Sequence, residues 1–318
     1  MPQPRATVMV LTSRPSDYEA VRKHIVDVKE DVHQEGTWIT QGRLPESPWD
    51  IALAELDGDV VTTAVLTERI IAWMRPEALF FVGVADSLDD RIRTGDVVVG
   101  TKVYAVQGGE QTPEGFLVHP QAWHSSHRLQ QAARFTLRGK VHLAPIAVAD
   151  VVLSDARSAI AEFLGRHYGD AAAIETEGSG VAHAAHLSGQ LDALVIRAIR
   201  GRADASRDSG AGPSAQEVEA VEQAAAAVVA ILRRTEPFRR RATTSARGSE
   251  DSQEGPHRRP RHHCPPRPGR RHEHRRARHR TAVRRARRGA AIPGREAAVR
   301  RRAHAPGRAG LSHRRTAR

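Results

Sequence analysis

Carboxylates that could do chemistry stand beside apolar runs of the sequence. Glu175 and Glu177 lie two residues apart at the end of one such run, and Asp17 lies where an amphipathic segment begins. A carboxylate accepts two hydrogen bonds at once and can take a proton from water, so these groups could bind hydroxyls or act as a general base. The dipole at a helix start also favours an acidic residue, so a purely structural role for Glu177 and for Asp17 stays open.

Residue types that bind metals cluster near the C-terminal end, as His-His-Cys at 262–264 and His-Glu-His at 272–274. They lie among prolines and arginines, without the paired spacing that structural zinc sites show. We therefore expect no metal and no cofactor. The single cysteine, Cys264, leaves no disulfide framework and fits a reducing compartment.

The net charge divides the chain into two parts. Of 49 Lys and Arg and 37 Asp and Glu residues, 26 bases, all of them Arg, and 5 acids follow Glu236. The 26 bases against 5 acids give this tail +21, and the remaining 23 bases against 32 acids give residues 1–236 a charge of −9. Only the tail could therefore bind nucleic acid, through its phosphates. GC-rich coding sequence read in an unselected frame would show the same bias toward arginine, so both interpretations stay open.

The apolar periodicity ends where the tail begins. Residues 237–318 are rich in Arg, His, Pro, Ala and Gly and poor in aromatic and β-branched residues, so they cannot bury enough apolar surface to fold. We expect one domain over 1–236 and a disordered tail over 237–318. The N-terminal apolar run is too short for a signal peptide, and no apolar stretch is long enough to cross a membrane. We therefore expect a cytoplasmic protein with no membrane contact.

Elements of two kinds alternate along residues 1–236, as in an α/β layer fold. The apolar runs at 78–84 and 193–196 are continuous, which is typical of strands buried on both faces, so we expect a three-layer α/β/α arrangement. The strands are expected at 7–11, 37–41, 51–56, 78–84, 97–104, 141–147, 171–174 and 193–199.

Helices are expected in four places between these strands. Ser16 is predicted to cap the first, the second covers 61–73 and ends before Pro76, and Ser154 is predicted to open the third. The last is predicted to run from Ser214 to about Arg233. Its buried face is expected to contain Val218, Val221, Ala225, Val228, Val229 and Leu232.

Four segments in order resemble the nucleoside phosphorylase and nucleosidase superfamily, which includes purine nucleoside phosphorylase and methylthioadenosine/S-adenosylhomocysteine nucleosidase. They are VMVLTSRPSDYEAVRKHI (8–25), RPEALFFVGVADSLDDRIRTGDVVVG (75–100), PIAVADVVLS (145–154), and the pair AIETEGSGVAHAA (173–185) and VIRAIRGRADASRD (195–208). The resemblance covers about 230 residues. It implies a central mixed, twisted sheet, a purine nucleoside as ligand and a homo-oligomer.

The resemblance also implies roles for individual residues. The family cleaves the bond between ribose C1′ and purine N9 through a transition state like that of glycoside cleavage. Glu177 occupies the position whose carboxylate accepts from the ribose 2′ and 3′ hydroxyls, and Asp17 occupies the position of the glutamate that activates water in nucleosidases. The other positions implied to contact substrate are Asp86, Ser87, Val152, Thr176 and Arg200.

The sequence departs from the family at one strand end. Where the family has Arg-Gly-Ile-Ser-Asp, whose aspartate meets purine N7, this chain has Arg-Ala-Ile-Arg-Gly at 197–201. The expected acid is therefore Gly201, and its neighbour is the cation Arg200. Asp204 matches the family's second aspartate and could act as the acid if its loop bends inward.

Further departures affect the choice of nucleophile. Two glycines expected after Ala85 are Asp86 and Ser87, and the Ser-Gly pair expected after Ala147 is Val-Ala. An aspartate at position 86 would repel a phosphate ion, which favours hydrolysis over phosphorolysis unless Arg200 neutralises it. Side chains in place of glycines should also reshape the pocket.

Three hypotheses follow for the function. The first is a purine nucleoside N-ribosyl hydrolase, or a phosphorylase if Arg200 neutralises Asp86, with a degenerate active site acting on a purine nucleoside or thioadenosine derivative. The second is a catalytically weak or inactive nucleoside-binding sensor, which Gly201 and Asp86 support. The third is a nucleic-acid-binding protein that acts through its tail, although the acidic residues 1–236 count against it.

Overall fold

The computed structural model describes residues 5–106, 108–113, 115–139, 141–155, 157–189, 191–203 and 214–237. Asp204 and residues 238–318, with both histidine clusters and Cys264, lie outside the described residues. The domain boundary at 236 therefore stays a prediction.

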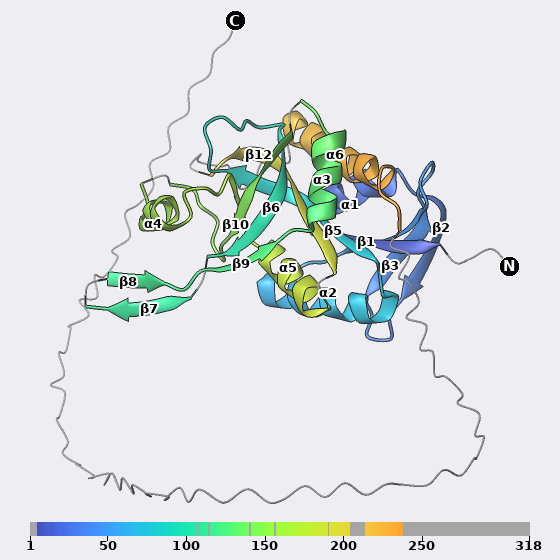
Figure 1. Cartoon of the computed structure of the whole chain (residues 1–318), viewed down its shortest axis with the longest axis horizontal. Helices are drawn as coiled ribbons and strands as arrows, with labels where there is room; N and C mark the ends of the chain where they lie inside the picture. Colours follow the sequence, from blue (N-terminus) through green and yellow to red (C-terminus); the bar gives the residue numbers. More distant parts are fainter. Residues whose placement is uncertain are drawn as a thin grey trace, which may run out of the picture. The chain divides into compact units, whose positions relative to one another are not determined.

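The elements alternate along the chain and are labelled in Figure 1. The strands are β1 (Ala6–Thr12), β2 (Val26–Val32), β3 (Trp38–Arg43), β4 (Trp49–Glu55), β5 (Ala78–Ser87), β6 (Val97–Ala105), β7 (Gly109–Thr112), β8 (Gly115–Val118), β9 (Gln121–His124), β10 (Val141–Val148), β11 (Ala173–Glu175) and β12 (Asp192–Arg202). The helices are α1 (Pro15–Arg22), α2 (Val60–Met74), α3 (His127–Thr136), α4 (Ala159–His167), α5 (Gly178–Leu187) and α6 (Ala215–Leu232). No helix of the described residues is long and apolar enough to cross a membrane.

Ten strands form one mixed sheet in the order β11-β10-β6-β12-β5-β1-β4-β3-β2, with β9 beside β6. Strands β4, β1, β5 and β12 are parallel, whereas β6 runs antiparallel to β12 and parallel to β10. The end of β5 also pairs with β11, which in turn pairs with β10. These pairings close β5, β12, β6, β10 and β11 into a ring, a feature that local sequence patterns do not predict.

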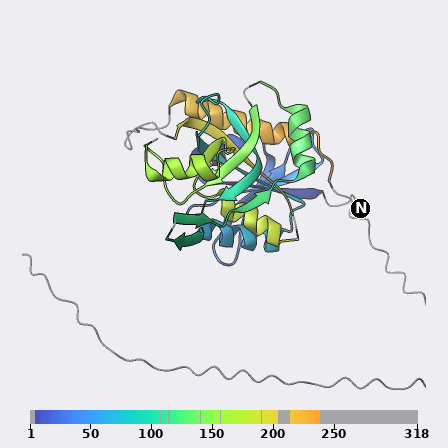
Figure 2. The same cartoon turned by 60° about the vertical axis from the view of Figure 1, so that its left-hand side comes forward.

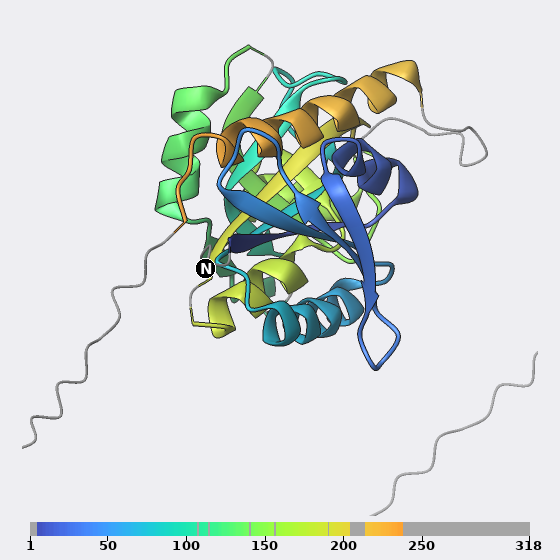
Figure 3. The same ribbon diagram turned by 90° about the vertical axis from the view of Figure 1, so that its right-hand side faces the viewer.

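Alternate residues of the central strands pack on opposite faces of the sheet. Val8, Val10 and Phe80 point into one core with α1, α3 and α6, whereas Met9 and Phe81 point into a second core with α2 and α5. Successive side chains of a strand leave on opposite sides, so both faces of a covered sheet must be apolar. Figures 1 and 3 show the two helical layers on either side of the sheet, and the predicted three-layer α/β/α fold is confirmed.

A smaller apolar cluster lies where β10 and β11 end. Leu164 and Tyr168, at the C-terminal end of α4, pack there with Ala147 and Ile174. The β7–β8 hairpin lies next to α4 in Figure 2, and the rings of Phe116 and Phe163 are 5.9 Å apart. This cluster supports the segments that follow β10 and β11.

All eight predicted strands are confirmed, with ends that differ by a few residues. Four strands, β2, β7, β8 and β9, were not predicted. Their residues are mostly exposed or half-buried, so they carry neither a continuous apolar run nor a clean alternation.

The last predicted helix is confirmed as α6, which Ser214 caps by accepting a hydrogen bond from Glu217 N. One residue of its predicted buried face is wrong, because Val218 is 47% exposed. No residue of the first turn of α6 is buried, so the helix reaches the core only from Ala220 onward.

Two predicted helix starts are wrong. The third helix begins at Ala159 rather than after Ser154, because Ser158 provides the cap through a hydrogen bond from Ala161 N. The first helix begins at Pro15, where the fixed φ of proline suits a first turn. Ser16 does not cap it, and its hydroxyl donates to Asp17 instead.

Candidate active site

Five segments that are far apart in the sequence meet around one cavity of about 190 Å³. Each segment lies at or just beyond the carboxyl end of a strand, namely β1, β5, β10, β11 and β12, and ligands of α/β folds bind at such strand ends. The lining residues are Ser13, Arg14, Val84, Ala85, Asp86, Val151, Val152, Leu153, Ile174, Glu175, Thr176, Glu177 and Arg200.

A β-bulge presents Arg200 to this cavity. In the parallel pair of β12 with β5, Ile199 pairs with Ala85 and Gly201 pairs with Asp86, so Arg200 is an extra residue without a partner in the register. A bulge of this kind re-aims a side chain and is frequent beside functional sites. Here it brings the Arg200 guanidinium onto Asp86.

Arg200 and Asp86 form a two-point ion pair. Nε of Arg200 donates to Oδ1 of Asp86 over 3.1 Å, and Nη2 donates to Oδ2 over 3.2 Å. The Asp86 side chain is 6% exposed and that of Arg200 is 29% exposed. Arg200 therefore neutralises the charge of Asp86, which is the condition under which the sequence allows phosphorolysis. The positive charge of the guanidinium is balanced by the same contact, so this pair offers a phosphate ion no net positive charge.

Glu175, one of the lining residues, forms a buried ion pair with Arg197. Nη2 of Arg197 donates to Oε2 of Glu175 over 2.7 Å, and the two side chains are 1% and 4% exposed. Glu175 also accepts the backbone N–H of Glu177 over 3.0 Å and of Gly178 over 2.8 Å, which satisfies the start of α5. A Cβ at Gly83 would lie 2.2 Å from Nη1 of Arg197, so the guanidinium requires a glycine there.

Because Glu175 satisfies the helix start, Glu177 is left to face the cavity. Glu177 is the N-cap residue of α5, but its side chain makes no capping hydrogen bond, so the expected interaction of this acid with the helix dipole stays a prediction beside its role in the site. Burial raises the pKa of the Glu177 carboxyl above its ordinary value, while the charge of Arg197 and a hydrogen bond with Ser13 oppose that shift. The charges of Glu175 and Asp17 raise the pKa further.

Asp17 is fully buried and does not line the cavity. Arg14 covers it: Nε donates to Oδ2 over 3.1 Å, and Nη2 donates to Oδ1 over 2.8 Å. Nη1 of the same arginine donates to Glu217 of α6 over 2.7 Å. Burial would lower the pKa of Arg14, but its hydrogen bonds and charge interactions with these two carboxylates raise it.

The other predicted site residues are placed as follows. Thr176 and Val152 line the cavity, and Val152 is 66% exposed. Ser87 lines a neighbouring cavity of about 200 Å³, and its hydroxyl donates to Asp89 O and accepts from Asp89 N. Asp204 lies outside the described residues.

Sequence patterns did not identify Arg14, Ser13 or Glu217 as members of this site. Arg14 stands three residues before Asp17, a spacing at which helical side chains meet, so local spacing alone could have indicated their ion pair. Glu217 is 203 residues from Arg14, and no local pattern links them.

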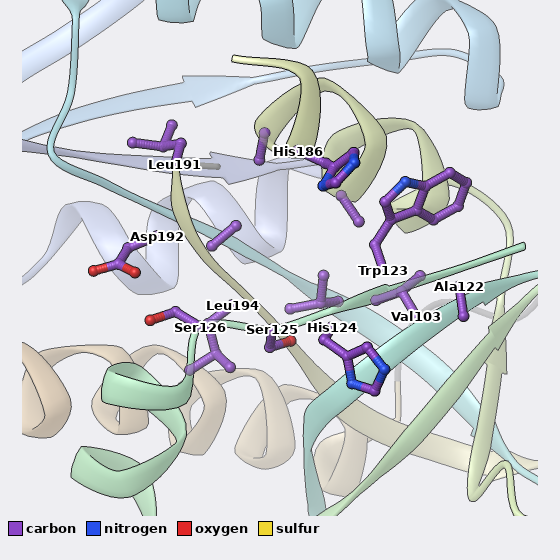
Figure 4. A pocket seen from close by; sticks show the side chains of 14 residues that line it. Val103, Ala122, Trp123, His124, Ser125, Ser126, His186, Leu191, Asp192 and Leu194 are labelled. Carbon is purple, nitrogen blue, oxygen red and sulfur yellow. The ribbon is translucent and has the colours of Figure 1, made fainter. Parts of the chain in front are cut away.

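A larger hollow of about 440 Å³ lies at the opposite end of β12, where that strand begins. Figure 4 shows His124, His186 and Trp123 around it, and Trp123 stacks on His183 of α5 with ring centroids 4.8 Å apart. Three of its polar side chains serve the fold: Ser125 donates to Gly100 O, Ser126 caps α3 and Asp192 pairs with Arg128. The charged groups suited to nucleoside chemistry lie in the smaller cavity.

Comparison with solved structures gives the same fold. The methylthioadenosine/S-adenosylhomocysteine nucleosidase of S. pneumoniae, solved with a transition-state inhibitor, has a TM-score of 0.61 and 21% identity, covering 71% of this chain and 98% of that one. The S-adenosylhomocysteine nucleosidase of Streptococcus pyogenes has a TM-score of 0.63 and 15% identity, covering 74% and 100%. Futalosine hydrolase of Helicobacter pylori has a TM-score of 0.59 and 18% identity, covering 72% and 100%.

The family comparison covers the whole described fold. Residues 7–235 match the model of the phosphorylase superfamily, from β1 to the residues after α6. This range contains all the segments that line the cavity. The chain therefore belongs to the phosphorylase superfamily.

Proposed function

We propose that this cavity binds a purine nucleoside and hydrolyses its N-glycosidic bond slowly. The proposal depends mainly on Glu177. Among the described carboxylates that line the cavity, Asp86 and Glu175 are each ion-paired with an arginine, whereas Glu177 makes no ion pair and faces the cavity. The family and the nucleosidase folds described above support a nucleoside as the ligand.

Glu177 suits the ribose of such a ligand. An ionised carboxylate accepts hydrogen bonds from two hydroxyls at once, as the 2′ and 3′ hydroxyls require. It also stabilises the positive charge that develops on the sugar as the bond to the base breaks. Ser13, just beyond the end of β1, lines the cavity together with Glu177, so a hydroxyl stands near this carboxylate.

Hydrolysis breaks the bond between C1′ and the purine nitrogen and forms a bond from water oxygen to C1′. The water loses a proton to a carboxylate, and the bonding electrons leave with the purine, which takes up a proton. Asp17 is the carboxylate suited to receive the proton of water, but Arg14 now occupies both of its oxygens. Gly201 offers no acid to the purine, so we expect slow turnover.

Water is favoured over phosphate as the nucleophile. A phosphate site needs cationic side chains whose positive charge is not already balanced by carboxylates. Both arginines that line this cavity, Arg14 and Arg200, are ion-paired with carboxylates, and Arg14 is paired with two. A phosphate ion would therefore meet a carboxylate beside each of these cations, whereas water and a neutral base carry no charge that a carboxylate repels.

A nucleoside-binding sensor without turnover is the second candidate. The observation that favours it is the ion pair that covers Asp17, since both carboxylate oxygens accept from Arg14 and the side chain is fully buried, which leaves no oxygen exposed to a water molecule in the cavity. In this case nucleoside binding at Glu177 would persist while no base is released.

The test incubates the full-length protein with adenosine, inosine, guanosine and methylthioadenosine, with and without phosphate, and measures free base by chromatography. We expect slow release of free base and free ribose that does not depend on phosphate and is lost in Glu177→Gln. The control Glu30→Gln changes an exposed glutamate of β2 and should leave release unchanged. Ribose 1-phosphate as product would exclude hydrolysis, and binding without release would identify the sensor.

A further inference from the structure

We propose that Arg200 selects the base, so that the cavity prefers 6-oxopurines, which present two hydrogen-bond acceptors, over 6-aminopurines. This inference rests on the proposed nucleoside site and adds to it the class of base. It also differs from the adenine-type ligands with which several structures of similar fold were solved.

The cavity lining offers two chemically different parts to a nucleoside. Glu177, which we assign to the ribose, lines the cavity with Ser13. The rest of the lining, which we assign to the base and call the second or base end, is mostly apolar (Val84, Ala85, Val151, Val152, Leu153 and Ile174), and its polar members are Arg14, Asp86, Glu175, Thr176 and Arg200. A planar base attached to the ribose therefore lies against this second part of the lining.

Arg200 is held in a fixed orientation at that second end. The bulge in β12 sets its backbone, and the two hydrogen bonds to buried Asp86 set the plane of its guanidinium. Asp86 in turn sits in a doubly paired part of β5, opposite both Gly201 and Ile174. The fork is therefore preorganised, which reduces the side-chain entropy lost on binding.

The Arg200 guanidinium retains donors for a ligand. A guanidinium carries five N–H groups, and the contacts with Asp86 use one on Nε and one on Nη2. Within the described residues, Nη1 of Arg200 makes no hydrogen bond, and the side chain is 29% exposed and lines the cavity. The base end of the cavity thus presents donors.

The same end presents no uncommitted carboxylate to an amino group. Asp86 accepts from Arg200, Glu175 accepts from Arg197 and two backbone N–H groups, and Gly201 contributes no side chain. This statement covers the described lining of the cavity. A base with an amino group there would therefore place its donors against the donors of Arg200.

The edges of the purines differ in this respect. Hypoxanthine and guanine present O6 and N7, two acceptors that match an arginine fork, whereas adenine presents the N6 amino donor beside the N7 acceptor. One well-formed two-point contact discriminates against the wrong base by about tenfold or more. An amide side chain has the opposite preference, since one donor and one acceptor match N6 and N7 of adenine.

The experiment measures dissociation constants of the full-length protein for hypoxanthine, adenine, inosine and adenosine by calorimetry. We expect hypoxanthine and inosine to bind at least about tenfold more tightly than adenine and adenosine. Arg200→Gln should reverse that order. The matched control is Arg202→Gln, because Arg202 lies two residues further along β12 and does not line this cavity. It should leave the order of affinities unchanged.

Arg200→Lys provides a second variant that keeps the charge beside Asp86 but loses the planar fork. It should reduce the preference to within about threefold while the melting temperature stays close to wild type. Equal or tighter binding of adenosine by the wild type would overturn the assignment of Arg200, even if Glu177→Gln abolished nucleoside binding. If none of the four ligands bound, both the proposed nucleoside site and the role of Arg200 would be refuted.

Discussion

Replacing Arg197 by Met should destabilise the protein strongly, because it leaves Glu175 buried without its counter-charge. The Glu175 side chain is 4% exposed and its carboxylate lies 2.7 Å from the Arg197 guanidinium. Methionine fills a comparable volume beside Phe81, over whose ring the guanidinium now lies at 4.0 Å, so loss of packing contributes little. Removing one partner of a buried ion pair typically costs about 3–5 kcal/mol.

This loss of free energy of unfolding corresponds to a large decrease in the melting temperature. For a folded region of this size, each kcal/mol lowers the melting temperature by about 2–4 °C, so the variant should melt roughly 6–20 °C below wild type. Differential scanning calorimetry and urea denaturation both measure the loss. Arg43→Met removes an arginine from an exposed pair with Asp27 and should cost less than about 1 kcal/mol.

A second substitution tests the cause. Glu175→Gln in the Arg197→Met background removes the uncompensated charge, and its carbonyl oxygen can still accept a backbone N–H from the start of α5. We expect it to recover a substantial part of the lost stability at pH 7. A single variant within about 2 °C of wild type, or a double variant no more stable than the single one, would refute this reasoning.

Four further predictions concern the site and the domain boundary. Burial raises the pKa of Glu177, and protonation removes a hydrogen-bond acceptor for the ribose. As the pH is lowered, nucleoside affinity should therefore begin to decrease while the pH is still above 4.5, the ordinary pKa of glutamate. Calorimetry across pH 4–8 measures this decrease, and Glu177→Gln should show no dependence on pH. Because the pKa of Glu177 is raised by folding, ionisation of this carboxyl lowers the free energy of unfolding once the pH exceeds that pKa. Glu177→Gln removes the charge, so it should slightly stabilise the protein above that pKa and have no such effect below it. Arg14→Met should uncover Asp17 and increase base release by about tenfold or more, measured by chromatography, whereas Arg14→Lys should have a smaller effect; unchanged release would exclude Asp17 as the base. Deleting the residues after Glu236 should leave the melting temperature nearly unchanged in calorimetry, and a large decrease would place the boundary elsewhere.

The sequence by itself determined the layers of the fold. A strand such as β5, which is covered by helices on both faces, must be apolar at every position from Ala78 to Val82. Such a run can be recognised in the sequence without knowing which strands or helices pack against it. The exposed strand β2 was missed for the complementary reason, since a strand with solvent on both sides imposes no pattern. Helix α6 was found because Ser214 and the apolar stripe are local features.

For the site, the sequence determined which residue types stand at strand ends but not how they are paired. It indicated Glu177, Asp17, Asp86 and Arg200. Their states depend on contacts between segments that are distant in the chain: Arg200 meets Asp86 across 114 residues.

Only the tertiary structure decided that Asp17 is covered by Arg14, which also binds Glu217, and that Glu175 rather than Glu177 satisfies the start of α5. It also decided the bulge that turns Arg200 into the cavity. The physical reason is that charge pairing acts through space and depends on strand register, whereas periodicity reports only whether a side chain faces apolar or polar surroundings.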